Sequence, residues 1–111
     1  MTFDRFDVVK VPFPFTDKPA KTVRPALVLS DAVAFNAAAG HSVMALITSA
    51  GHATWPLDVP IDDLPAAGLP VASLVRMKLF TLDHRLVVGT IGKLTPDDAR
   101  SVTNALTRLF R

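Results

Sequence analysis

An alternation of residue types near the start of the chain constrains its fold most strongly. Every second position from Val9 to Phe15 is apolar, and Lys10, Pro12 and Pro14 stand between them. Successive side chains of a β-strand point to opposite faces, so this pattern predicts a strand with one buried face. Because proline has no N–H to donate, the two prolines indicate a sheet edge or the point where the strand leaves the sheet.

Further apolar segments of strand length follow along the chain. They are Pro25–Ser30, Ser42–Ser49, Trp55–Ile61, Ser73–Phe80 and Leu86–Ile91. Residues 16–23, 61–70 and 81–85 are expected to form polar or turn-rich connections, and the alanine-rich residues 31–40 a short helix or turn. Gly92 is expected to end the sheet.

The last segment has the features of an amphipathic helix. Thr95 can cap it, Pro96 fits the first helical position, and Asp98 lies three residues after the cap. Apolar residues then recur at helical spacing, at Ala99, Val102, Leu106 and Leu109. A helix from about Pro96 to Leu109, added to five or six short strands, predicts a mainly β protein with a C-terminal helix, built as a small barrel or sandwich.

Length and composition limit the possible chemistry. The 111 residues suit a single domain spanning residues 1–111, and the 50% apolar content excludes an intrinsically disordered chain. The chain has no cysteine, which excludes disulfides, thiolate catalysis and cysteine-based zinc sites. With 12 Lys and Arg against 10 acidic residues, all of them Asp, the net charge is only +2. Any polyanion must therefore be bound by a local basic cluster.

The uncharged middle of the chain is too interrupted to span a membrane. No residue from Ala32 to Leu57 carries a formal charge, yet the longest apolar run there is Val43–Ile47. A membrane helix needs about 20 such residues. The charged start MTFDRFD is unlike a signal peptide. A soluble, cytoplasmic protein without a membrane partner is therefore expected.

Several motifs occur in a fixed order along the chain. FDVVKVPFPFTD (Phe6–Asp17), RPALVLS (Arg24–Ser30) and ALITS (Ala45–Ser49) resemble the opening of the MazF/PemK family of toxins from toxin–antitoxin pairs. SLVRMKLFTLDHRL (Ser73–Leu86) and IGKLTPDD (Ile91–Asp98) resemble the last strands and the start of the last helix of that family. The resemblance therefore extends over nearly the whole chain.

This resemblance implies a fold, an activity and partners. The fold is an SH3-like barrel of five to seven strands with a C-terminal helix, and it forms homodimers. Members are mostly metal-independent endoribonucleases that act on single-stranded RNA without a cofactor, and a cognate antitoxin covers the RNA groove. The family's catalytic pair, the Arg of RPxLVxS and the Thr of ITS, corresponds to Arg24 and Thr48 here.

These residue types suit RNA cleavage without a metal, in which the 2′-hydroxyl is the nucleophile. The products are a cyclic phosphate and a 5′-hydroxyl. The guanidinium of Arg24 can donate to two phosphoryl oxygens, and the hydroxyl of Thr48 adds one more donor. The sequence does not identify the group that moves the protons: family accounts give Arg24 a share, and His52 is a local candidate.

The residues expected to contact RNA lie around this pair in the sequence. They are Phe15, Thr16, Lys18, Lys21, Ser49, His52, Trp55 and Lys78. Lys18 and Lys21 form a basic cluster that can clamp the RNA backbone, and Phe15 or Trp55 can stack on bases. Without the resemblance, the lysine loop is equally well explained as a solvated loop. Trp55 can also belong to the core or a dimer interface, although its flanking prolines favour an interface or groove.

Ordinary structural roles explain the same residues if the motifs are set aside. Arg24 is then a surface charge and Thr48 a strand residue. The three histidines are widely spaced and form no paired ligand motif, so no metal site is predicted.

The chain also departs from the family pattern at two places. Phe6 stands where the family usually has Gly, and MKLFTLD at Met77–Asp83 replaces a Glu-Gln-Ile-Arg-Thr-Ile-Asp segment. Lys78 stands where the family segment has a Gln, whose amide can recognise a base, and is interpreted as a phosphate contact instead. Two alternatives remain open: an inactive RNA-binding barrel, and a toxin of the same fold that binds a protein such as gyrase. The second is disfavoured because the Leu109-Phe110-Arg111 end lacks the Trp-Gly-Ile terminus of such toxins.

Overall fold

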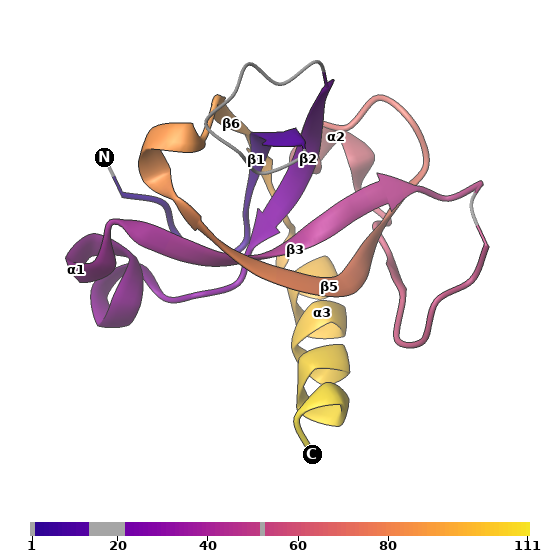
Figure 1. The fold of residues 1–111 in the computed structure, drawn as a ribbon. Helices are drawn as coiled ribbons and strands as arrows, with labels where there is room; N and C mark the ends of the chain where they lie inside the picture. The colour runs from indigo at the N-terminus through magenta and orange to yellow at the C-terminus, as the bar shows by residue number, and fades with distance from the viewer. Residues whose placement is uncertain (1, 14–21, 52) are drawn as a thin grey trace.

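The structure, a computed structural model, describes residues 2–13, 22–51 and 53–111. Within these residues an antiparallel sheet of six strands has the order β4-β5-β3-β2-β1-β6 (Figure 1). The strands are β1 (Asp7–Phe13), β2 (Thr22–Val28), β3 (His41–Ser49), β4 (Val59–Pro60), β5 (Ser73–Asp83) and β6 (Gly89–Lys93). The helical segments are η1 (Ala32–Asn36), α1 (Ala37–Ala39), α2 (Leu64–Ala67), η2 (His84–Leu86) and α3 (Pro96–Leu109). The sheet curls and α3 projects below it (Figure 1), so the expected mainly β barrel with a C-terminal helix is confirmed.

Alternate residues of the central strands pack into two apolar clusters, one on each face of the sheet. Val8 belongs to the larger cluster and Val9 to the smaller one, and Leu27 and Val28 divide in the same way. The larger cluster consists of Val8, Leu27, Leu29, Ala45, Ile47, Val59, Ile61, Ala67, Leu69, Val75, Leu94, Val102 and Ala105. The smaller cluster consists of Phe3, Val9, Val11, Ala26, Val28, Met44 and Leu82. Because both faces are covered, the central strands are apolar at most positions rather than at every second one.

Helix α3 has the bounds predicted from its sequence, Pro96–Leu109. The hydroxyl of Thr95 accepts a hydrogen bond from the backbone N–H of Asp98 at 3.3 Å, as expected for the cap. The carboxylate of Asp98 is buried and accepts hydrogen bonds from the backbone N–H groups of Asp62 and Asp63, in the loop between β4 and α2. The first turn of α3 therefore anchors this loop as well as starting the helix.

Pro12, the proline of β1 that the structure describes, lies where β1 has kept only one of its two neighbouring strands. β1 lies between β2 and β6, and its pairing with β6 covers only Asp7 to Lys10. Pro12 lies beyond this stretch and pairs with Val23 of β2 alone. A missing N–H costs little there, because β6 offers no acceptor.

The predicted strand over Trp55–Ile61 is mostly wrong. Only Val59–Pro60 pairs with β5. The backbone N–H of Trp55 instead donates to the Asp58 carboxylate at 2.9 Å, and Leu57 has a φ of 64°. A local turn held by an aspartate therefore replaces the first part of the strand.

Three further boundaries differ from the prediction. β5 continues to Asp83, through the polar corner expected at 81–85, because its side chains remain paired with β3. The turn follows at His84–Leu86, and β6 begins only at Gly89. Within the connection expected at 61–70, Asp63 caps the short helix α2 by accepting from the backbone N–H of Ala66 at 3.0 Å.

Gly92 does not end the sheet, since β6 continues to Lys93. Its role is a close approach between β6 and α2: a Cβ atom at Gly92 would lie 2.3 Å from the carbonyl carbon of Ala67. Real Cβ atoms do not come this close to backbone, so only glycine fits.

Phe6 occupies a backbone conformation that favours glycine. Its φ is 73°, in the left-handed region, although its side chain packs against the larger cluster. Its N–H donates to Val28 and its carbonyl accepts from Leu94, which holds the backbone in place. The departure from the family's glycine noted in the sequence therefore falls on a strained residue.

Candidate active site

The face of the sheet that carries the smaller cluster changes from apolar to basic at one end. Ala26 pairs with Leu46 between β2 and β3. Arg24 and Thr48 lie two residues farther along these strands, so they belong to the same face as Ala26. The structure thus brings the two predicted catalytic residues together at the ends of neighbouring strands.

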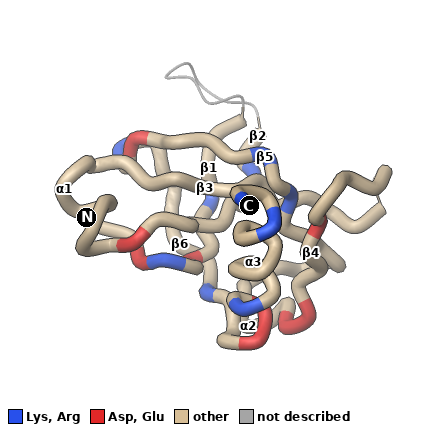
Figure 2. Tube along the Cα trace, turned by 90° about the horizontal axis from the view of Figure 1, so that it is seen from below, with Lys and Arg blue, Asp and Glu red and all other residues tan. Residues whose placement is uncertain are grey.

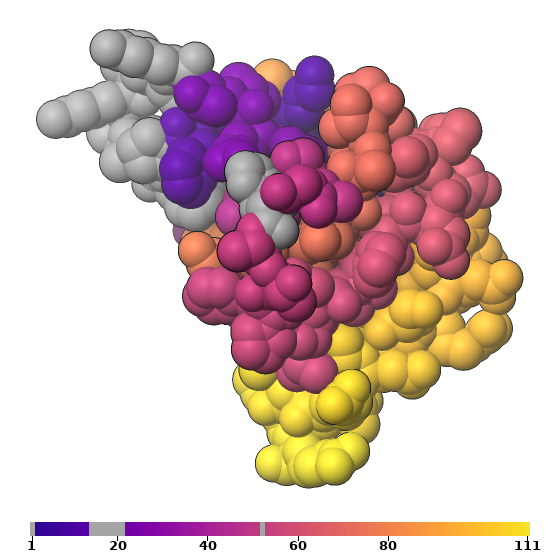
Figure 3. Space-filling model, turned by 90° about the vertical axis from the view of Figure 1, so that its right-hand side faces the viewer, coloured from indigo at the N-terminus to yellow at the C-terminus, as the bar shows by residue number. Residues whose placement is uncertain are grey.

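Both residues line a hollow of about 410 Å³. The lining residues are Phe13, Arg24, Leu46, Thr48, Ala53, Thr54, Trp55, Arg76 and Lys78. Figure 3 shows this side of the molecule, with the segment after β3 in magenta next to the ends of β1 and β2 in indigo and purple. We call this hollow the basic hollow, because three of its lining side chains are cationic.

Arg24 is half-buried, and its guanidinium carbon lies 5.4 Å from the centre of the Phe13 ring. Among the residues that the structure describes, no carboxylate forms an ion pair with Arg24. Thr48 is buried, with 7% of its surface exposed. The site therefore combines a positive charge that has no carboxylate partner in the described part of the chain with a nearly buried hydroxyl, a pair suited to an anionic oxygen.

Phe13 was predicted to share the buried face of β1 with Val9 and Val11. It points to that face, yet 37% of it is exposed, because the face opens into the basic hollow there. Its ring lies against Arg24 and forms part of the site, a role that the sequence analysis missed.

Trp55 lies at the basic hollow and not in the core. The residue is 40% exposed, and two cations of β5 lie near its ring. Lys78 Nζ lies 4.7 Å and Arg76 Cζ 5.7 Å from the ring centre, within the range of cation–π attraction. An exposed indole beside two positive charges can hold both the base and the phosphate of a nucleotide.

A break in strand pairing accompanies these two cations. Leu46 of β3 pairs with Arg76, but the preceding residue, Ala45, pairs with Leu79, so Met77 and Lys78 are extra residues on β5. Such bulges re-aim side chains and are frequent next to active sites. Sequence reasoning missed Arg76, although its spacing of two from Lys78 is a signal that both share a strand face.

The carboxylate of Asp58 connects Arg76 to the Trp55 loop. It accepts hydrogen bonds from Arg76 Nε at 3.2 Å, Arg76 Nη2 at 3.0 Å and the Trp55 N–H at 2.9 Å. Burial raises the pKa of Asp58, but the hydrogen bonds from Arg76 and Trp55 and the charge of Arg76 outweigh it and leave the pKa below its ordinary value. The hydrogen bond to Asp58 in turn raises the pKa of Arg76.

The other residues predicted to contact RNA do not all enter this description. Ser49 is exposed at the end of β3, next to Thr48, and does not line the basic hollow. The remaining predicted residues lie outside the described part of the chain. They are Phe15, Thr16, Lys18, Lys21 and His52.

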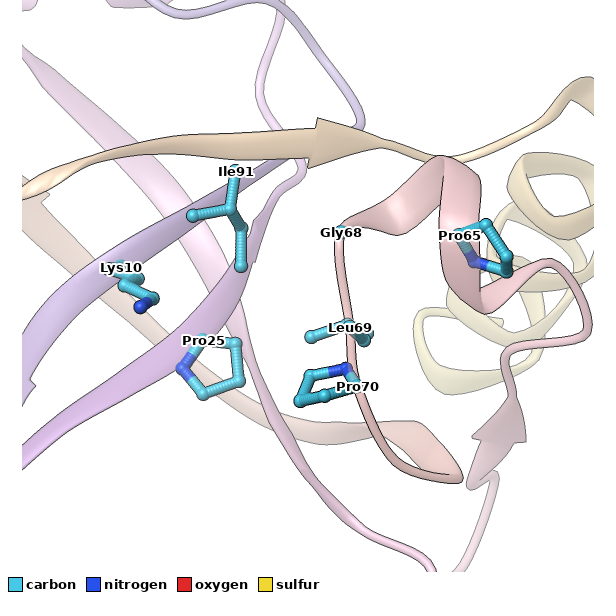
Figure 4. A pocket seen from close by; sticks show the side chains of 7 residues that line it. All are labelled: Lys10, Pro25, Pro65, Gly68, Leu69, Pro70 and Ile91. Atoms are coloured by element: carbon cyan, nitrogen blue, oxygen red, sulfur yellow. The ribbon is translucent and has the colours of Figure 1, made fainter.

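A second hollow, of about 520 Å³, lies on another part of the surface (Figure 4). Pro25 and Ile91 face Leu69 and Pro70 across it, and of the described residues that line it Lys10 alone is charged. It is larger than the basic hollow but holds neither a pair of donors nor an exposed aromatic ring. The basic hollow is therefore the better candidate for binding an anion.

Charges of both signs are interspersed over the rest of the molecule, as the view from below in Figure 2 shows. With a net charge of only +2, binding of a polyanion needs a local basic cluster, and the basic hollow provides one. Among the described residues, no helix has the length and apolar content needed to cross a membrane.

Residues 4–110 match the family model of the PemK-like, MazF-like toxin of type II toxin–antitoxin systems. The chain belongs to this toxin family. Toxins of the MazF/PemK family are generally endoribonucleases. By direct sequence comparison, no curated protein matches the chain.

Solved MazF structures share the fold over nearly the whole chain. A MazF from Deinococcus radiodurans is 26% identical with a TM-score of 0.74, and the match covers 99% of this chain and 97% of that one. A MazE–MazF complex from the same organism gives 24% and 0.76, with 99% and 96% covered. An endoribonuclease in complex with its cognate antitoxin from a mycobacterial species gives 19% and 0.77, with 97% and 94% covered.

Proposed function

We propose that this toxin is a metal-independent endoribonuclease that cuts single-stranded RNA in the basic hollow. The observation that carries the proposal is the placement of Arg24 and Thr48 on one sheet face, at an open hollow that also presents Trp55. A guanidinium, a hydroxyl and an aromatic ring supply two phosphate donors and a base platform within one site.

In the proposed reaction, the 2′-hydroxyl of the RNA attacks the adjacent phosphorus, and the bond from phosphorus to the 5′-oxygen breaks. The products carry a 2′,3′-cyclic phosphate and a 5′-hydroxyl. One proton leaves the 2′-hydroxyl and one reaches the departing 5′-oxygen.

Arg24 stabilises the charge that builds on the non-bridging oxygens, and Thr48 donates one more hydrogen bond to the phosphate. The loss of such a donor commonly lowers the rate by about 10²–10³-fold. Arg24 and His52 are the candidates for carrying the protons.

RNA is positioned around this centre by charge and stacking. Lys78 contacts the backbone phosphate, and Trp55 stacks on a base. Phe15, Thr16, Lys18, Lys21 and Ser49 are proposed as further contacts on the basis of the family resemblance. Binding through phosphates weakens as salt increases, whereas stacking is less sensitive to salt.

A homodimer and a cognate antitoxin complete the proposal. Both complexes described above pair a toxin with its antitoxin, which supports a cognate antitoxin for this chain. We propose that this antitoxin covers the basic hollow. The antitoxin is proposed to bind through a disordered tail that folds on binding. The cytoplasm, where RNA and antitoxin are present, is the proposed location, and residues 1–111 are proposed to act as a single domain.

The test is cleavage of varied single-stranded RNAs by the purified chain in EDTA. Fragments with cyclic phosphate and 5′-hydroxyl ends are expected, and a 2′-deoxy substitution at the cut site should abolish them. Retention of RNA on a filter without any cutting would favour the inactive barrel. Neither cutting nor binding of any RNA would contradict the proposal.

A further inference from the structure

The ion pair between Asp58 and Arg76 differs from the others in the described part of the chain. Only 11% of each of these two side chains is exposed, whereas Arg85, Arg100 and Lys93 expose half or more of theirs in their own pairs. The Arg76–Asp58 contact is bidentate, through Nε and Nη2, as is the contact of the exposed Arg85 with Asp83. Among the described ion pairs, Arg76–Asp58 is thus the one that is both bidentate and nearly buried.

This ion pair holds a loop in place. Arg76 Nη2 donates to the carbonyl of Ala53 at 2.8 Å, and the Asp58 carboxylate accepts from the Trp55 N–H at 2.9 Å. Both ends of the segment from Ala53 to Asp58 are thereby tied to β5. Leu57, inside this segment, has a φ of 64°, a strained value for a residue other than glycine.

A buried ion pair contributes little net stability, because desolvation of the charges offsets their attraction. The structural effect of the Asp58–Arg76 pair is to hold the exposed Trp55 side chain in position. Trp55 is 40% exposed above an almost buried carboxylate and guanidinium, and Lys78 lies 4.7 Å from the ring centre. A network that fixes an exposed aromatic ring at a hollow suits ligand binding better than core packing.

We propose that Asp58 is a positioning residue that fixes Trp55, through Arg76 and the loop backbone, as the base-stacking platform of the RNA site. Asp58 itself contacts no RNA. This inference rests on the proposed function, because it assigns the platform to RNA. The platform lowers the KM for RNA without taking part in bond cleavage, so its loss raises KM by about tenfold at an unchanged kcat.

The chain provides its own reporter of this platform. Trp55 is its one tryptophan and it has no tyrosine, so the intrinsic fluorescence near 340 nm comes from Trp55. A base stacked on the indole quenches this emission, whereas a phosphate chain without bases does not. Two probes therefore suffice: a 2′-O-methyl RNA 12-mer, which cannot be cut, and inorganic polyphosphate.

The variants are Asp58→Asn, which removes the charge, and Arg76→Lys, which keeps the charge but loses the two-pronged contact. Asp97→Asn is the matched control, because Asp97 forms an exposed ion pair with Arg100 at the start of α3. We expect the 12-mer to quench the unchanged chain and the control equally. Asp58→Asn should lose at least half of the quenching and bind the 12-mer about tenfold more weakly. Polyphosphate should bind at least as tightly as to the unchanged chain, because the substitution removes a negative charge beside Arg76.

The outcomes separate this inference from the proposed function. Normal quenching and normal KM in Asp58→Asn would overturn the inference and leave the nuclease untouched. A chain that cuts no RNA but shows the expected quenching pattern would overturn the nuclease and support the platform. If circular dichroism shows Asp58→Asn unfolded, Arg76→Lys decides: raised KM at constant kcat supports the platform, and unchanged KM overturns it.

Discussion

One face of the sheet is buried and apolar at one end and opens to the basic hollow at the other. At one end, Val9, Val28 and Met44 are fully buried and Phe3 closes over them. At the other end, the same face presents Arg24 and Thr48 to a hollow of about 410 Å³. The change takes only two residues along a strand, from Ala26 to Arg24. Stability and RNA chemistry are therefore expected to be separable by position along a single strand.

A polar residue lies at the apolar end too, but its surroundings differ from those of Thr48. Asn36 is fully buried, and its amide donates to the carbonyls of Phe3 at 2.8 Å and Ser30 at 2.9 Å. Its hydrogen bonds are satisfied inside the protein, whereas Thr48 faces the basic hollow. This difference marks Asn36 as structural and Thr48 as a candidate for ligand contact.

The largest effect is expected at the basic end. Arg24→Ala should lower the single-turnover rate of RNA cleavage by about 10²–10³-fold, because it removes the main phosphate donor. Arg24→Lys keeps the charge but loses the planar fork, so an intermediate rate is expected. The melting temperature should change little, since Arg24 has no ion-pair partner among the described residues. If Arg24→Ala cut RNA at the full rate, the proposed catalytic role of Arg24 would be wrong.

The next effect is the reverse, a loss of stability without a loss of chemistry. Met44 is fully buried in the smaller cluster, so Met44→Ala should lower the free energy of unfolding by about 2–5 kcal/mol. Urea unfolding measures this change, and the cleavage rate should stay within about twofold wherever the variant is folded. A selective loss of activity in folded Met44→Ala would show that the two ends are coupled.

A smaller loss of stability is expected at Asn36. Asn36→Ala leaves the carbonyls of Phe3 and Ser30 without their donor and should cost about 1–3 kcal/mol. RNA binding, measured by filter retention below the melting temperature, should be unchanged. A variant as stable as the unchanged chain would contradict the structural role of Asn36.

The smallest effect concerns acid. Asp58 has a folded-state pKa below its ordinary value of 3.8, so the unfolded chain binds its proton first. Its contribution to stability is complete above about pH 5 and disappears as the pH falls through the lowered folded-state value. Arg76 faces Asp58 from β5, and Arg108 of α3 lines, together with Asp58, a separate hollow that is not the basic hollow. Because the hydrogen bond to Asp58 raises the pKa of Arg76, this arginine stays charged throughout, and Trp55 fluorescence should be constant from pH 8 to about 5 and change only below about 4. A transition above pH 5 would contradict the assigned state of Asp58.

Local patterns carried much of the fold. Thr95, Pro96 and Asp98 predict the start of α3 correctly, because capping depends on neighbouring residues alone. The strand expected over Trp55–Ile61 fails because Asp58 ties the Trp55 backbone into a turn. Gly92 was placed at the end of the sheet, although its function is the contact with α2. Such contacts join residues distant in sequence, and no periodicity reports them.

Of the site residues, too, some were predicted from the sequence and others were missed. The motif resemblance selected Arg24 and Thr48, and Trp55 and Lys78 were expected as RNA contacts beside them. The structure places these four at one hollow, where their roles in RNA chemistry remain predictions. Asp58 and Arg76 were missed because their pairing crosses from a loop to β5. The spacing of two between Arg76 and Lys78 could have indicated their shared face, whereas the β5 bulge beside them is not visible in the alternation of residues.

The central claim is that Arg24 and Thr48 act on the same phosphate. A double-mutant cycle on the RNA cleavage rate in EDTA, with Arg24→Ala, Thr48→Ala and the double variant, tests it most directly. If the two residues form one unit, the double variant should be about as slow as Arg24→Ala alone. Rate losses that multiply independently, or a Thr48→Ala chain that cuts at the full rate, would contradict the account.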